Sequence, residues 1–223
     1  MNLSRQANIV RTEQREKKIV IIGCGGIGSN VAHILFSTGF TNLTLFDGGD
    51  VAAENIAPQF FTTDQIGLNK AMALKQRLAH IFSEEDAGSI TAVEDNFRRR
   101  HLIDEADIVI VGTDSMESRR SIWGSEGNIT GWQWWIDARM GGTQYKVLTV
   151  GNNRLSREAY ATSLIPESTP LPCGEKATAF ITKGLLPGLI GGIVYNLTSH
   201  NEDVEPVPFM IMDTVVGLER LKV

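Results

Sequence analysis

Residues 18–28 read KIVIIGCGGIG, and this stretch decides the fold. Its opening residues are a short apolar run that ends in glycines, as in a parallel strand buried on both faces. A helical pattern follows over residues 27–38, with apolar side chains recurring on one face. A strand, a glycine turn and a helix in this order predict a sheet whose parallel strands are joined by right-handed helical crossovers.

The rest of the chain repeats this alternation. We expect further strands at residues 42–46, 89–93, 108–111, 132–137, 144–150, 206–212 and 215–223. We expect further helices at residues 70–82, 98–106, 115–123 and 175–198, with loops at 51–69 and 166–173. The fold class is therefore α/β: a Rossmann-like, doubly wound, mostly parallel sheet with antiparallel C-terminal strands. Without a linker, residues 1–223 form one expected domain, with residues 1–17 as an N-terminal arm.

Composition narrows the class of protein. Of 223 residues, 42% are hydrophobic and 21% charged, which excludes a disordered, collagen-like or coiled-coil chain. The net charge of −5 argues against a broadly basic nucleic-acid binder. Cys24 and Cys173 are too few for a disulfide framework, so a reduced, cytoplasmic setting is expected. No targeting segment and no membrane span is expected, because residues 180–197 contain Lys183, Pro187 and glycines.

The glycine-rich turn fits a dinucleotide fingerprint. Gly23, Gly25, Gly26 and Gly28 lie between a strand and a helix, where backbone N–H groups can approach phosphate oxygens. Asp47 ends the second strand, 19 residues after Gly28, and is placed to accept hydrogen bonds from ribose hydroxyls. A tight turn without a ligand is the alternative interpretation. The pattern alone does not choose between NAD, FAD and ATP.

Three further stretches favour ATP. Residues 47–60 read DGGDVAAENIAPQF, residues 67–70 read GLNK, and residues 112–114 read GTD. With these motifs the chain resembles the ThiF/MoeB/HesA family, the ubiquitin-like-protein activating enzymes. The resemblance covers residues 3–119 and continues weakly to about residue 197. An NAD-dependent oxidoreductase is a further alternative, but no convincing proton-transfer residue accompanies it.

The resemblance implies an ATP-dependent adenylyltransferase, with ATP and Mg²⁺ as cofactors. No zinc is expected, because the chain has only two cysteines. It would activate the C-terminal carboxylate of a ubiquitin-like or sulfur-carrier protein ending in Gly-Gly, and it would act as a homodimer. The implied nucleotide-binding residues are Gly23, Gly25, Gly26, Gly28, Asp47, Asn55, Gln59 and Lys70. The implied catalytic residues are Lys70 on the phosphates, Asp114 on Mg²⁺, and Arg5, which together with Gln6 would reach into the partner's site.

Two departures from the family pattern bear on activity. Pro58 stands where the family has an arginine, and Gly49 stands where it has a second aspartate. Losing one preorganised cationic donor typically costs about 3 kcal/mol of transition-state stabilisation. The alternative function is therefore a catalytically degenerate relative that binds a nucleotide or a partner. The two C-x-x-C pairs that hold zinc in many relatives are also missing, and Cys173 is either an activated thiol or an ordinary loop cysteine.

Each candidate residue also has a structural interpretation. Lys70 lies at a helix start, where an anion would offset the unfavourable dipole. Asp114 could cap the helix that follows, Asn55 could cap a turn, and Arg5 could belong to a frayed terminus. Arg119 is expected to form a structural pair. Residues 98–101, RRRH, are interpreted as a solvated helix start, with a phosphate-binding patch as the alternative. The tryptophans of residues 132–135 are interpreted as core or subunit interface.

Overall fold

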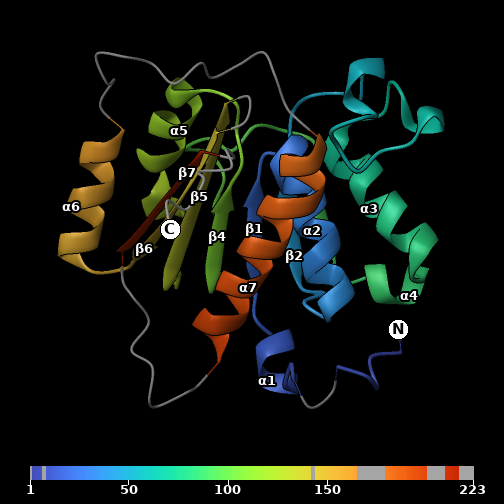
Figure 1. Ribbon diagram of the computed structural model, residues 1–223, viewed down its shortest axis with the longest axis horizontal. Helices are drawn as coiled ribbons and strands as arrows, with labels where there is room; N and C mark the ends of the chain where they lie inside the picture. Colours follow the sequence, from blue (N-terminus) through green and yellow to red (C-terminus); the bar gives the residue numbers. More distant parts are fainter. Residues whose placement is uncertain (1, 7–8, 142–143, 165–178, 200–208, 216–223) are drawn as a thin grey trace, which may run out of the picture.

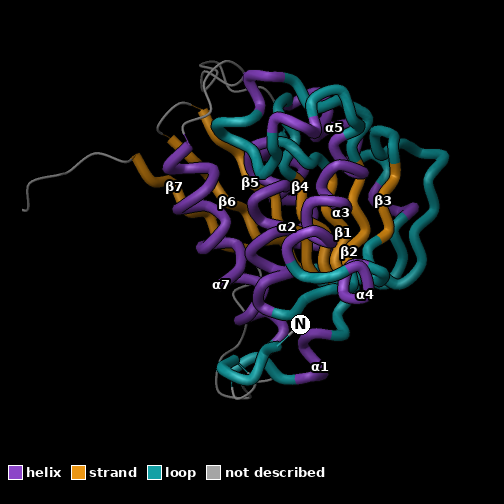
Figure 2. Tube along the Cα trace, turned by 90° about the vertical axis from the view of Figure 1, so that its right-hand side faces the viewer, coloured by secondary structure: helices purple, strands orange, loops and turns teal. Residues whose placement is uncertain are grey.

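The computed structural model describes residues 2–6, 9–141, 144–164, 179–199 and 209–215. In this part of the chain, one sheet runs in the order β3-β2-β1-β4-β5-β6-β7 (Figure 2). The strands are β1 (Ile19–Ile22), β2 (Leu43–Phe46), β3 (Thr91–Val93), β4 (Ile108–Val111), β5 (Trp134–Gly141), β6 (Gln144–Gly151) and β7 (Phe209–Val215). Across the sheet, neighbouring strands from β3 through β2, β1 and β4 to β5 are parallel, whereas β6 is antiparallel to both of its neighbours. The predicted fold class is confirmed.

Helices cover both faces of this sheet (Figure 1). They are α1 (Thr12–Arg15), α2 (Gly26–Thr38), α3 (Lys70–Ile81), α4 (Glu84–Ala87), α5 (Met116–Trp123), α6 (Arg154–Ser163) and α7 (Leu186–Thr198). Alternate residues of a strand point to opposite faces. Ile19 and Ile21 accordingly pack in one core with α2, α3 and α7. Val20 and Ile22 pack in a second core with α5 and α6. Burial on both faces explains why β1 is a continuous apolar run.

The N-terminal segment packs at the end of the sheet opposite the glycine turn. The Gln14 side-chain amide donates to the Tyr195 carbonyl (3.3 Å) and to the Thr198 hydroxyl (3.1 Å), near the end of α7. Further upstream, the Gln6 side chain donates to the Ser37 carbonyl, at the end of α2. The segment is therefore bound to the C-terminal ends of two helices of its own chain.

Some predicted elements differ from the structure or are described only in part. Residues 98–106 form no helix, because His101 turns back to cap the local chain through Nδ1 and packs on Phe97. The strand expected at 206–212 is observed in part as β7, and the strand expected at 215–223 lies, except for Val215, outside the described residues. The loop expected at 166–173, with Cys173, lies outside the described residues.

The helix expected at 175–198 is interrupted. Its described part begins with a turn of π-helix, Phe180–Leu185, and continues as α7. Pro187 lies in the first turn of α7. Because proline has no N–H to donate to the preceding turn, a regular α-helix cannot run through this position without losing a hydrogen bond. The wider turn before Pro187 accommodates that loss.

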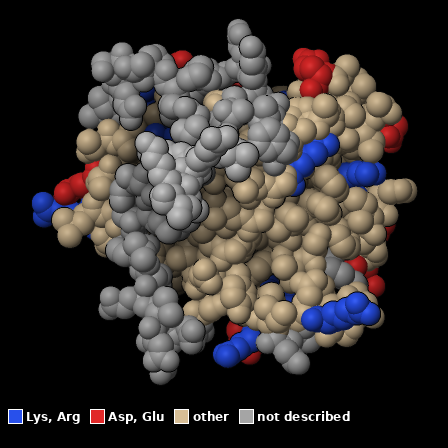
Figure 3. All heavy atoms as spheres, in the orientation of Figure 1, with Lys and Arg blue, Asp and Glu red and all other residues tan. Residues whose placement is uncertain are grey.

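The tryptophans near β5 belong to the core of the same chain. Trp132 is 3% exposed and Trp135 is fully buried, and both rings contact Trp123 edge to face. The core interpretation is confirmed, and these side chains lend no support to the predicted homodimer. On the face seen in Figure 1, the described surface that is in view is mostly uncharged, and its charged side chains lie mainly toward the margins (Figure 3). Among the described helices, none combines the length and apolar character needed to cross a membrane.

Candidate functional site

A cavity of about 1160 Å³ lies at the carboxyl ends of β1, β2 and β4. β1 is flanked by β2 on one side and β4 on the other, so successive crossovers leave β1 in opposite directions. Open α/β sheets bind ligands at this switch point, because the loops on its two sides diverge and leave a crevice. The cavity walls come from the loops after these strands, from segment 54–59, and from the starts of α2, α3 and α5.

The glycine turn brings the start of α2 close to β1. Gly23 has φ +93°, a left-handed conformation, and its N–H donates to the Phe46 carbonyl (2.8 Å). A Cβ on Gly28 would lie 1.9 Å from the Gly23 carbonyl oxygen, so only glycine permits this approach. No side chain caps α2 at Gly25. The N–H groups of its first turn are therefore left for an anion in the cavity.

Asp47 ties the glycine turn to the end of β2. One carboxylate oxygen accepts the Cys24 N–H (2.7 Å) and the other accepts the Gly49 N–H (2.8 Å). Cys24 is fully buried, and burial raises the pKa of its thiol well above the ordinary value, as does the nearby Asp47 charge. Cys24 is therefore a neutral packing residue, while Asp47 lines the cavity.

The segment after β2 is anchored on α2. The Asn30 amide donates to the Pro58 carbonyl (3.0 Å), and the Phe60 N–H donates to the Ser29 hydroxyl (3.0 Å). The irregular loop expected at 51–69 contains two short 3₁₀ turns, η1 (Ala53–Asn55) and η2 (Thr63–Gln65). Pro58 lines the cavity, but its side chain brings no cation there.

Asn55 and Gln59 line the same wall of the cavity. The Asn55 side-chain oxygen accepts the Ala52 N–H (3.0 Å), so Asn55 also has the turn-capping role considered above. Gln59 is 8% exposed, and its buried side-chain oxygen has no hydrogen-bond partner among the described residues. Buried acceptors are usually satisfied. The Gln59 oxygen is thus suited to accept a hydrogen bond from a ligand.

Lys70 opens α3 at the cavity. The Asn69 side-chain oxygen caps this helix by accepting the N–H groups of Ala71 (2.9 Å) and Met72 (3.3 Å). A Cβ at Gly49 would lie 3.7 Å from the Lys70 Nζ and 3.2 Å from an Asp47 oxygen. The missing side chain at Gly49 therefore leaves room beside the Lys70 ammonium and the Asp47 carboxylate.

Asp114 follows β4 and lines the cavity with an exposed side chain. The cap of α5 is Ser115, whose hydroxyl accepts the Ser118 N–H (3.1 Å). Asp114 is therefore not the helix cap that one interpretation expected. Within the described residues its carboxylate makes no hydrogen bond or ion pair, so it can bind a cation that enters the cavity.

Arg98 also lines the cavity, and the sequence interpretation missed it. Its N–H donates to His101 Nδ1 (3.0 Å), and Phe97 beside it is 3% exposed and packs edge to face on Phe46. Arg100 pairs with Asp95 instead. Three successive arginines after the third strand were the available signal. The three arginines are exposed, as expected of a solvated segment, but no helix starts there.

The structure brings together most candidate residues, but not all of them. Arg5 is exposed in the segment that packs at the far end of α2, away from the cavity of its own chain.

The acidic cavity-lining residues outnumber the basic ones: Asp47, Glu54, Asp114 and Glu117 against Lys70 and Arg98. No cluster of three or more His, Cys, Asp or Glu side chains suited to a metal occurs in the part of the chain that the structure describes.

Comparison with known proteins gives one family. A family model described as the ThiF family matches residues 3–124, just over half of the chain. Ubiquitin-like modifier-activating enzyme 5 of Drosophila simulans is 33% identical over 132 residues, covering 53% of this chain and 33% of that protein. The same enzyme of Culex quinquefasciatus is 34% identical over 135 residues, covering 55% of this chain and 34% of that protein. The matched part is thus about a third of these curated relatives.

Solved structures share the fold. The E. coli tRNA N6-threonylcarbamoyladenosine dehydratase TcdA has a TM-score of 0.66 at 17% identity, covering 88% of this chain and 93% of that chain. E. coli MccB, crystallised with ATP, has a TM-score of 0.64 at 18% identity, covering 96% of this chain and 67% of that chain. Together with the family match over residues 3–124, these comparisons agree with the motifs and the sheet order: the chain belongs to the ThiF family.

Proposed function

We propose that this chain is an ATP-dependent adenylyltransferase that activates the C-terminal carboxylate of a ubiquitin-like or sulfur-carrier protein. One observation carries the proposal. The start of α2, without a side-chain cap, lines a single cavity together with the Lys70 ammonium and the Asp114 carboxylate. An NAD-dependent oxidoreductase has no evident need of these last two groups, whereas a polyphosphate and its cation use both.

The charge of the cavity favours a nucleotide bound with Mg²⁺. Four acidic side chains against two basic ones would repel a bare triphosphate. Mg²⁺ is commonly held by one or two carboxylates together with the substrate phosphates. Asp114, exposed and unpaired within the described residues, fits this role. When bound, the ion would neutralise charge on the phosphates.

The remaining nucleotide contacts follow the order of the strands. The phosphates would lie at the first turn of α2, after β1, and the ribose at Asp47, after β2. The unpaired Gln59 oxygen would accept a hydrogen bond from a donor of the nucleotide or of the incoming peptide. Asn55 would orient the nucleotide from the same wall.

The proposed reaction needs positioning more than acid–base catalysis. A C-terminal carboxylate has a pKa of about 3.5, so at neutral pH it is ionised without a general base. Its oxygen attacks the α-phosphorus, the bond to the bridging oxygen breaks, and pyrophosphate leaves with that electron pair. The obstacle is the approach of two anions, which fixed positive charge and correct alignment overcome. Lys70 would supply such charge.

Partners and setting are also proposals. The relatives include proteins named ubiquitin-like modifier-activating enzyme 5, and E. coli MccB was crystallised with the peptide MccA, which supports a protein or peptide substrate. We propose a cytoplasmic homodimer acting on a partner with a C-terminal Gly-Gly, with Arg5 reaching the cavity of the second subunit. We also propose one domain over residues 1–223 and no bound zinc.

Pro58 supports a second candidate function. The cavity holds a proline where the family pattern has an arginine, so one expected cation is missing. A chain that binds Mg²⁺ and ATP without catalysis, as one half of a heterodimer, is compatible with that loss. The two functions differ in one measurable property, which is the formation of an acyl-adenylate.

Exchange of labelled pyrophosphate into ATP tests the proposed function. We expect exchange that depends on Mg²⁺ and on a small protein ending in Gly-Gly. In calorimetry we expect tighter binding of ATP with Mg²⁺ than of NAD. Tight ATP binding without exchange would favour the non-catalytic alternative, and tighter binding of NAD would refute both.

Arg98 is expected to contribute to nucleotide affinity. It adds a cation at the cavity, so Arg98→Ala should weaken Mg²⁺·ATP binding by about tenfold, the order of 1.4 kcal/mol. Arg99→Ala is the matched control, because the neighbouring Arg99 is exposed but does not line the cavity. Calorimetry on both variants measures the difference. Equal affinities would show that Arg98 does not reach the nucleotide.

A further inference from the structure

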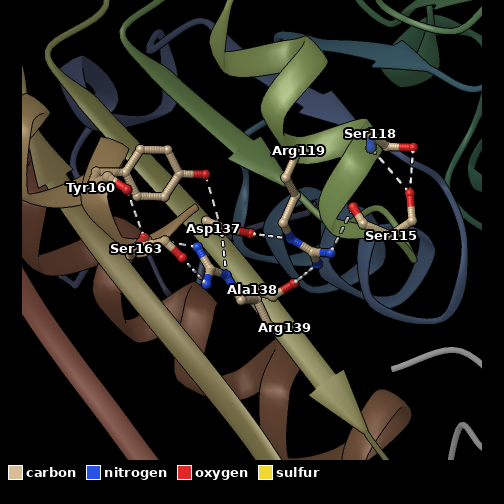
Figure 4. A network of polar contacts seen from close by, with 8 residues as sticks. All are labelled: Ser115, Ser118, Arg119, Asp137, Ala138, Arg139, Tyr160 and Ser163. Atoms are coloured by element: carbon tan, nitrogen blue, oxygen red, sulfur yellow. Dashed lines mark hydrogen bonds and ion pairs between the residues drawn. The ribbon is translucent and has the colours of Figure 1, made fainter. Parts of the chain in front are cut away.

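Asp137 is a carboxylate at the centre of the sheet. It lies in β5 beside Val111, the last residue of β4, and is fully buried. One of its oxygens accepts from Arg119 Nε (2.8 Å), and the other accepts from Arg139 Nε (2.7 Å) and from the Tyr160 hydroxyl (3.0 Å). Figure 4 shows the two guanidinium groups approaching this carboxylate from opposite sides.

The two arginines connect Asp137 to different helices. Arg119 belongs to α5, and its remaining nitrogens donate to the carbonyls of Ser115 (3.3 Å) and Ala138 (2.9 Å). Arg139 instead donates to the carbonyl (3.1 Å) and the hydroxyl (3.0 Å) of Ser163, at the end of α6. Arg119 thus contacts the first turn of α5 at the cavity, whereas Arg139 extends the other way, to the end of α6 (Figure 4).

Arg119 is the buried polar contact between helix α5 and the sheet, beside the apolar contacts of Met116, Ile122 and Trp123 with the second core. Only Arg119 and Ile122 are buried among the residues of this short helix. Met116, at the start of the helix, is only partly buried against the second core, and Arg119 is the fully buried residue nearest to that start. The hydrogen bond from Arg119 to the Ser115 carbonyl holds the residue that directly follows Asp114.

We propose that Arg119 is a positioning residue: through Ser115 and Asp137 it fixes the start of α5 on β5, and so holds Asp114 where a nucleotide-bound Mg²⁺ enters. The inference rests on the proposed function for the identity of the ligand. The sequence suggests only a structural pair for Arg119. In this inference the buried Arg119–Asp137 pair also affects nucleotide binding. Partners that orient a metal ligand typically change metal affinity or activity by about 10- to 100-fold when they are removed.

The same carboxylate provides a matched pair of variants. In Arg119→Met, Asp137 keeps Arg139, and in Arg139→Met it keeps Arg119, so neither variant leaves the buried carboxylate without a cation. Both arginines are nearly buried, at 2% and 7% exposure, and the two losses of stability should be similar. Only Arg119→Met releases the turn beside Asp114.

The test combines nucleotide binding with hydrogen exchange. In calorimetry, Arg119→Met should weaken ATP binding about tenfold in the presence of Mg²⁺ but by less than about threefold in its absence. Arg139→Met should leave both affinities within about twofold of the wild type. Arg119→Lys, which keeps the charge without the planar fork, should give an intermediate loss. Amide exchange should rise at residues 114–119 in Arg119→Met, and at residues 160–164 in Arg139→Met.

The outcomes separate this inference from the proposed function. Equal losses of Mg²⁺·ATP affinity in the two methionine variants, or unchanged exchange at 114–119 in Arg119→Met, would overturn the positioning role. Wild-type ATP affinity that does not respond to Mg²⁺, together with the expected exchange pattern, would instead refute the proposed use of Asp114 and leave Arg119 as the residue that orders this turn.

Discussion

Alanine at Gly28 is expected to destabilise the protein by about 3 kcal/mol or more, at the upper end of overpacking in a rigid site. The new Cβ would lie 1.9 Å from the Gly23 carbonyl oxygen and 3.2 Å from the Ile21 side chain. The oxygen belongs to the backbone, and the Gly23 N–H donates to the Phe46 carbonyl. The turn therefore cannot shift away from the new Cβ without losing this hydrogen bond. For a chain of this size the loss corresponds to a fall in Tm of about 6 to 12 °C.

Alanine at Gly25 is the control for this prediction. A Cβ there would meet no atom within 4 Å, and the φ of Gly25, −80°, lies outside the left-handed region. We therefore expect Gly25→Ala to keep its Tm within about 2 °C of the wild type, a change of under 1 kcal/mol. Its methyl group would lie at the uncapped start of α2, so ATP affinity should fall. Thermal unfolding and calorimetry separate the two variants, and an unchanged Tm for Gly28→Ala would contradict the packing argument.

Strong local patterns made the central part of the fold predictable. β1 and β4 are buried on both faces, and a parallel strand in that position must be apolar throughout. Helix α6 carried no such pattern. Its buried side chains are Ser156 and Tyr160, while Leu155 is 78% exposed. Its position depends on the Tyr160 hydroxyl meeting Asp137, a contact between distant residues that no periodicity reveals.

The candidate site was predictable where it follows strand ends. The glycine turn directly follows β1, Asp47 directly follows β2, and Asp114 lies shortly after β4. Parallel strands bring their carboxyl ends to one edge of the sheet, so these residues meet there. Arg98 was not predictable in this way. Its place at the cavity depends on Phe97 and His101 packing on Phe46, which a run of three arginines does not indicate.

The sequence analysis did not identify the residues that cap α3 and α5. The electrostatic argument at Lys70 invoked an anion at the start of α3, but the Asn69 side chain already accepts two of the first N–H groups there. At α5 the cap is Ser115 and not Asp114. Both capping residues are one position away from the functional candidate, a difference that propensity alone does not resolve. In both cases the functional candidate is left free for the cavity.

Removal of the Lys70 ammonium is expected to slow adenylation by about 10² to 10³, or about 3 kcal/mol of activation free energy. The charge on the departing pyrophosphate grows during the reaction, so the Lys70 cation contributes more in the transition state than in the ground state. Lys70→Ala should therefore lower kcat while changing the KM for ATP much less. Pyrophosphate exchange over a range of ATP concentrations measures both parameters.

Asp47 should give the opposite pattern, because a ribose contact is similar in the ground and transition states. Its carboxylate also holds the Cys24 and Gly49 N–H groups, so Asp47→Ala would loosen the glycine turn and raise the KM for ATP. Asp47→Asn keeps the size and one acceptor, and should raise KM less. Lys70→Arg, which retains the charge, should recover part of the lost rate. If Lys70→Ala and Asp47→Ala both keep wild-type exchange, the cavity at β1 is not where the reaction occurs. If the wild type shows no exchange, Pro58→Arg tests whether the missing cation alone is the cause.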